Sequence, residues 1–159
     1  MLHDPELLEP VRAAMPSADE DTVRIVAAIA GLLGAVAYAD GVYQPAEAAQ
    51  VRRELDRIQG LNSYGVATIL RVLEERLVDL ATVDIARAAR ALRELADPDL
   101  RREVLALLLR LAAADGSIAS REVAMMRQIT TALGLSQSDY NAIQSEYRDL
   151  LEVLKSSGG

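Results

Sequence analysis

Apolar residues recur at intervals of three and four along most of the chain, which is the spacing of one buried face of an α-helix. The clearest runs are Val66, Ile69, Leu70, Leu73 and Leu77, and then Leu100, Val104, Leu107, Leu108 and Leu111. No long segment alternates with a period of two, so no strand is predicted. We therefore expect an all-α, single-domain bundle of seven or eight helices.

Capping residues divide this pattern into separate helices. Pro5 starts a first helix, which Pro10 should keep short, and Ser17 with Glu20 forms a capping box for a helix over about 18–39. Further helices are predicted to start at Pro45 and after Asn62, Thr82, Asp97 and Ser136, and Gly41, Gly60 and Gly134 mark helix ends.

The helix over 18–39 is the most apolar of the set. Its uncharged run from Ile25 to Ala39 is shorter than the ~20 residues that span a bilayer, so we expect a buried central helix without membrane insertion. Ala27, Gly31 and Ala35 stand at four-residue steps and form a small-residue face for close packing.

The chain contains an internal repeat. Residues 37–47 and 112–122 each read as the end of an apolar helix, an Asp-Gly turn, a short loop and a new helix with Glu in its first turn. We expect two similar halves, over about 18–79 and 98–154, related by a pseudo-two-fold axis, with 156–159 as a flexible tail.

Composition and charge limit the possible functions. The 159 residues are 51% apolar but include no Phe, Trp or Cys, so the core must be aliphatic, and disulfides and thiolate chemistry are excluded. A net charge of −7 argues against nucleic acid and anionic membrane surfaces as partners. The N-terminus has no basic region before an apolar run, so no signal peptide is predicted and a cytoplasmic location is expected.

The repeated motif resembles the TerB family, which includes the bacterial tellurite-resistance protein TerB and is similar to the N-terminal region of the DjlA co-chaperones. The resemblance rests on Ala-x-Ala-Asp-Gly with Glu seven residues after the Asp, and on the stretch Leu133-Gly134-Leu135-Ser136, and it covers about 23–151. It implies a helical fold, stress or tellurite-resistance systems, partner proteins and, often, the inner face of the membrane.

The resemblance also implies a divalent cation at the acidic turns, with Asp40, Glu47, Asp115 and Glu122 as candidate ligands. Without Cys, the ion would be Ca²⁺, Mg²⁺ or Mn²⁺. Calcium requires about 6–8 oxygen ligands and two carboxylates supply about four, so we expect weak affinity. The remaining positions of both loops carry no acid.

A structural role explains the same four acids. A Glu in the first turn of a helix accepts free N–H groups, and an Asp in a turn accepts loop amides. On this interpretation, which we favour, each motif is only a helix–loop–helix clip.

Other charged groups are weaker candidates. Arg87, Arg90 and Arg93 step by three and could form a basic edge for an acidic partner, although exposure to water is the simpler interpretation. Arg101, Arg102 and Glu103 should form a solvated helix face. No nucleophile stands with a base, and no Glu-x-x-His pair is present.

We therefore expect a non-enzymatic helical module that binds partner proteins and has an acidic patch. A purely structural or oligomeric scaffold is the alternative, and a metal-dependent hydrolase is a third. The metal, the partner and the oligomeric state stay open.

Overall fold

The chain forms helices and no strands in the part that the computed structural model describes, residues 5–37, 45–58, 60–75, 85–113 and 120–146. The all-α prediction is confirmed, and the eight helices of these residues lie within the predicted range. They are α1 (Pro5–Ala14), α2 (Glu20–Ala37), α3 (Pro45–Asp56), α4 (Ser63–Glu75), α6 (Ile85–Leu95), α7 (Pro98–Ala112), α8 (Ser120–Ala132) and a further helix over 137–146.

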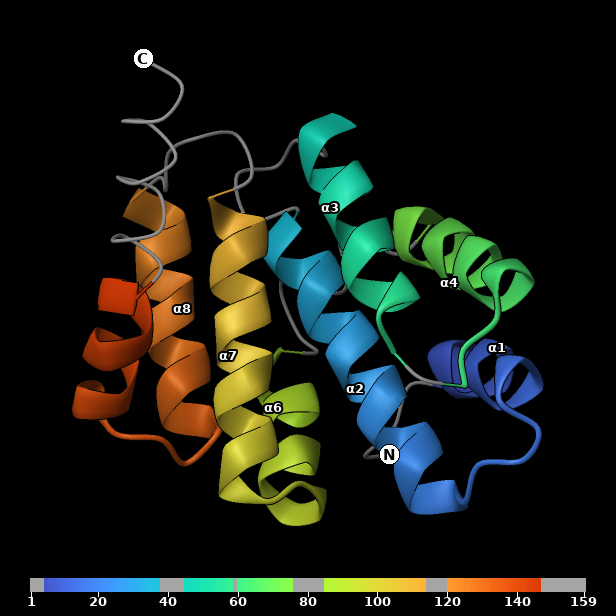
Figure 1. Cartoon of the computed structure of the whole chain (residues 1–159), viewed down its shortest axis with the longest axis horizontal. Coiled ribbons are helices and arrows are strands. Elements are labelled where there is room, and N and C mark those ends of the chain that lie inside the picture. The colour runs from blue at the N-terminus through green and yellow to red at the C-terminus, as the bar shows by residue number, and fades with distance from the viewer. Residues whose placement is uncertain (1–4, 38–44, 59, 76–84, 114–119, 147–159) are drawn as a thin grey trace.

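Helix α2 lies at the centre of the molecule (Figure 1), where it packs against α1, α3, α4, α6 and α7. Every residue from Val26 to Ala37 is buried, including the small residues Ala27, Gly31 and Ala35. The prediction of a buried central helix is confirmed. No helix within the described ranges is both long and apolar enough to cross a membrane.

The core is aliphatic, as the composition requires. Its largest fully buried side chains are Leu32, Leu33, Leu55, Ile69, Leu73, Leu92, Leu105, Leu108, Leu109, Leu111 and Met126. Because no Phe or Trp fills the gaps between helices, the helices must approach closely. At one such approach, a side chain added to Gly65 in α4 would clash with Ala14 Cβ, so α1 and α4 pack in contact through this glycine.

One predicted helix boundary near the N-terminus is wrong. Helix α2 begins at Glu20 rather than near 18, and its cap is Asp19, whose Oδ1 accepts the N–H of Thr22 at 2.7 Å. Ser17 is instead part of a turn. Helix α1 is short, with 10 residues, as predicted, although it continues for one turn beyond Pro10, where Val11 and Ala14 are buried.

The remaining caps follow the sequence pattern. Asn62 Oδ1 accepts the N–H of Gly65 at 2.7 Å, and Asp97 Oδ1 accepts that of Leu100 at 2.8 Å. Helix α3 ends at Asp56, somewhat before the predicted stop at Gly60. Gly134, with φ of +74°, follows α8, as expected for a glycine after a helix end. Gly41 and Thr82 lie outside the described residues.

Each repeat contributes one helical hairpin, α2–α3 or α7–α8. Figure 1 places the last turns of α2 and α7 and the first turns of α3 and α8 at the same end of the bundle. Helix α7 packs on both α2 and α3, so that the hairpins meet along these three helices. The pseudo-two-fold axis and the exact limits of the repeats stay predictions.

Candidate functional site

The four predicted acidic ligands are not assembled in the described part of the chain. Asp40 and Asp115 lie outside the described residues, as does the side chain of Glu122, whose backbone belongs to α8. Glu47 occupies the first turn of α3, as predicted, and it is buried with 5% of its surface exposed. Among the residues described, no group of three or more His, Cys, Asp or Glu could hold a metal ion.

A groove lies between α2, α3 and α7, where the two hairpins meet. It has a volume of about 650 Å³. Its apolar lining comes from α2, α7 and the turn after α3, and consists of Ile25, Val26, Ile29, Ile58, Leu100, Val104, Ala106 and Leu107, whereas α3 itself contributes Glu54. Arg57 on one wall and Glu103 on the other are both exposed, so the groove opens to solvent between groups of opposite charge.

An ion pair between Glu54 and Arg110, both of which line the groove, joins α3 to α7. The side chain of Glu54 is only 2% exposed, whereas that of Arg110 is 32% exposed. Arg110 donates from Nε to Glu54 Oε1 at 2.8 Å and from Nη2 to Oε2 at 2.9 Å. This two-point geometry is the strong form of an arginine–carboxylate contact.

Two further groups support the Glu54 carboxylate. Gln50 Nε2 donates to Glu54 Oε1 at 2.9 Å, and Arg57 Nη1 lies 3.7 Å from the same oxygen. Burial alone would raise the pKa of Glu54, but the hydrogen bonds and charge of Arg110, with help from Arg57 and Gln50, hold it below its ordinary value. Glu54 is therefore a buried, ionised carboxylate.

This ion pair was missed by sequence reasoning, although a signal for it exists. Glu54 follows Glu47 by seven residues and shares the apolar face of α3 with Val51 and Leu55. An acid on a buried face requires a cationic or hydrogen-bonding partner. The spacing does not say that the partner is Arg110, because only the tertiary packing brings α3 and α7 together.

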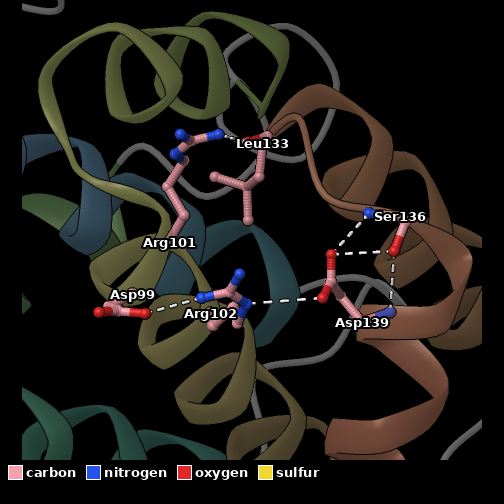
Figure 2. A network of polar contacts seen from close by, with 6 residues as sticks. All are labelled: Asp99, Arg101, Arg102, Leu133, Ser136 and Asp139. Carbon is pink, nitrogen blue, oxygen red and sulfur yellow. Dashed lines mark hydrogen bonds and ion pairs between the residues drawn. The ribbon is translucent and has the colours of Figure 1, made fainter.

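A second polar network ties the start of α7 to the residues after α8 (Figure 2). Arg101 Nη1 donates to the carbonyl oxygen of Leu133 at 2.9 Å. Arg102 lies between two carboxylates: its Nη1 is 2.7 Å from Asp99 Oδ1, and its Nε is 3.5 Å from Asp139 Oδ1. The prediction that Arg101 is part of a solvated face is wrong, because its guanidinium folds back onto the end of α8.

Asp139 also completes the last capping motif. Its Oδ2 accepts the backbone N–H and the hydroxyl of Ser136, each at 2.9 Å, and Ser136 Oγ accepts the Asp139 N–H at 3.1 Å. These hydrogen bonds, led by that from the Ser136 backbone, lower the pKa of Asp139. The predicted cap at Ser136 is confirmed. The contacts of Arg101, Arg102 and Asp139 hold the start of α7 against the segment that follows α8, which is a structural role.

Fold and site together define an all-helical module with an open groove and an internal ion pair. Residues 26–145, about three quarters of the chain, match the family model described as tellurite resistance protein TerB. The chain therefore belongs to the TerB family. Searches of curated proteins and of solved structures gave no match. The similarity to DjlA stays a prediction.

Proposed function

We propose that the chain is a non-enzymatic TerB-like module that acts as a protein-interaction scaffold in a bacterial stress or tellurite-resistance type system. The observation that carries this proposal is the groove between α2, α3 and α7. Its partly exposed apolar side chains Ile25, Ile58 and Leu107 lie beside exposed charges, a combination typical of a docking site for another polypeptide.

The charges of the groove specify its occupant. Arg57 follows α3 and Glu103 belongs to α7, so the two exposed charges come from different walls of the groove. A partner segment with a stripe of aliphatic side chains, an acid on the side of Arg57 and a base on the side of Glu103 would match both walls. An amphipathic helix meets this description, since its apolar stripe is flanked by polar positions.

The groove has the features of a binding site rather than of an active site. Its buried carboxylate, Glu54, is already engaged by Arg110, and this leaves it poorly placed to move a proton to or from a substrate. Any role in tellurite resistance would be indirect, because tellurite is an anion and the chain carries a net charge of −7. A cytoplasmic site of action at the inner membrane face belongs to the same proposal.

Affinity capture from the native host with a matched pair of variants tests the groove. Leu107→Gln places a polar amide in the apolar lining of the groove, whereas Leu70→Gln makes the same change at a partly buried leucine of α4 outside the groove. We expect a protein that the wild type and Leu70→Gln retain and Leu107→Gln loses. With that protein purified, Leu107→Gln should weaken the affinity about tenfold or more.

Retention of every captured protein by Leu107→Gln would contradict the groove proposal, as would equal loss with Leu70→Gln. Circular dichroism of both variants must show an unchanged helical content. A partner that still bound Leu107→Gln with full affinity would have to dock elsewhere.

Weak binding of a divalent cation by Asp40, Glu47, Asp115 and Glu122 is a second proposal. Its support is the family membership and the common position of the four flanking helix ends (Figure 1). Specific binding would raise the melting temperature in millimolar Ca²⁺, Mg²⁺ or Mn²⁺, and Asp40→Asn would abolish the rise. If the acids only cap helices, Asp40→Asn lowers stability and no cation shifts the wild type.

A further inference from the structure

Helix α6 presents a row of arginines to solvent. Arg87, Arg90 and Arg93 are all exposed. The opposite face of this helix is buried through Ile85, Ala89 and Leu92, and α6 packs on α2 and α8. We call Arg87, Arg90 and Arg93 the arginine row.

The arginine row has no internal partner in the described part of the chain. None of its three guanidinium groups makes a hydrogen bond or an ion pair with another described residue. Five arginines elsewhere in the described residues pair with carboxylates, namely Arg12, Arg52, Arg57, Arg102 and Arg110. In a chain with more acids than bases, three neighbouring arginines without a partner among the described residues form a local field of opposite sign to the whole.

A fourth guanidinium extends this field. A side chain placed on Gly134 would meet Arg93 Nε at 3.1 Å and Arg101 Nη1 at 3.0 Å, so both groups converge beside this residue. Arg101 is held there by the Leu133 carbonyl, as Figure 2 shows. Glu94 is the one acid of α6 itself, so the surface keeps a positive excess.

We propose that the arginine row docks an acidic segment of a partner protein. Guanidinium groups pair with carboxylates at two points, which gives such a contact geometry as well as charge. The row spans about 9 Å along the helix, given a rise of about 1.5 Å per residue, and this length suits a few carboxylates on one short segment.

The size of the row favours a short acidic segment over a membrane or a nucleic acid. At physiological salt, charges interact over about 8 Å, so a short acidic peptide is attracted mainly by the row itself. An extended polyanion would also be repelled by the net negative charge of the rest of the chain. A membrane would in addition need apolar anchors beside the row. Among the described residues, the exposed large hydrophobic side chain is Tyr64, on α4 rather than α6.

This docking surface is separate from the groove. No residue of α6 lines the groove, and so the two surfaces could engage different parts of one partner or two partners. Failure of one proposal leaves the other intact, because a groove variant such as Leu107→Gln should leave binding to the row unchanged.

Binding of a short synthetic Glu-rich peptide, followed by fluorescence anisotropy, tests the proposal. The triple variant Arg87→Gln/Arg90→Gln/Arg93→Gln removes the row, and Arg52→Gln/Arg53→Gln/Arg71→Gln removes the same charge from exposed positions of α3 and α4. We expect the row variant to bind at least about threefold more weakly than the control, since each exposed ion pair contributes a small, measurable amount. High salt should abolish the difference.

The double variant Arg87→Gln/Arg90→Gln keeps Arg93, whose side chain lies beside Gly134 after α8. It therefore tests binding in a protein that keeps this contact between α6 and the end of α8. It should retain the wild-type melting temperature and still weaken peptide binding. Equal weakening by the control variant would overturn the proposal, as would a wild type that binds vesicles of anionic lipid but not the peptide.

Discussion

The ion pair between Glu54 and Arg110 leads to an asymmetric prediction about stability. The Glu54 side chain is 2% exposed and that of Arg110 is 32% exposed, so only Arg110 can recover much hydration when its partner is removed. Arg110→Met would leave a buried carboxylate supported by Gln50 and by the more distant Arg57. Glu54→Gln would leave a guanidinium that water can reach.

The magnitudes follow from these exposures. Loss of one partner of a buried pair typically costs about 3–5 kcal/mol, and the remaining contacts of Glu54 reduce this to about 2–3 kcal/mol for Arg110→Met. Glu54→Gln should cost about 1–2 kcal/mol, near the net value of the one or two hydrogen bonds that it weakens. The double variant Glu54→Gln/Arg110→Met should be more stable than Arg110→Met alone, because it no longer buries an unpaired charge.

Urea denaturation at neutral pH, followed by circular dichroism, measures all three variants. The reasoning predicts that Arg110→Met is the least stable of them. It is refuted if Glu54→Gln costs as much as Arg110→Met, or if the effects of the two sites simply add. Additive effects would mean that the carboxylate and the guanidinium do not interact across the α3–α7 interface.

Three further predictions test the local physics. Folding lowers the pKa of Glu54, so the stabilisation that this carboxylate provides is complete above its ordinary pKa of 4.5 and is lost as the pH falls through the lowered pKa. The difference in stability between wild type and Glu54→Gln should therefore narrow when the pH is lowered. Gly65→Ala should cost about 1–3 kcal/mol through its clash with Ala14, and Ala14→Gly in the same chain should restore part of this in urea denaturation. Asp19→Ala should lower the melting temperature by removing the α2 cap, whereas Ser17→Ala should change it far less; equal effects in thermal melts would speak against Asp19 as the cap.

Local signals in the sequence predict most of the helices. The apolar period and the caps at Asn62, Asp97 and Ser136 act within a few residues, so they can be read without tertiary information. The cap of α2 was predicted wrongly because both Ser17 and Asp19 could cap this helix, and the turn after α1 places Asp19 at the cap position. Pattern alone cannot rank such competitors.

The candidate groove could not be predicted in the same way. Its lining comes from α2, α3 and α7, of which α7 is distant in the sequence from the other two, and its ion pair joins positions 56 residues apart. The sequence shows an acid, Glu54, on the apolar face of α3, but it does not show the partner of this acid, which depends on how α3 and α7 pack. The acidic turns that the family resemblance emphasised remain a hypothesis, since Asp40 and Asp115 lie outside the described residues.

Photo-crosslinking in the native host tests the central claim, that the groove between α2, α3 and α7 binds a partner protein. A photoreactive residue would replace Leu107 in the groove or, as a control, the exposed Gln128 on α8. The account predicts a discrete protein adduct from position 107 that is absent from position 128. The same adducts from both positions, or none from 107, would contradict it.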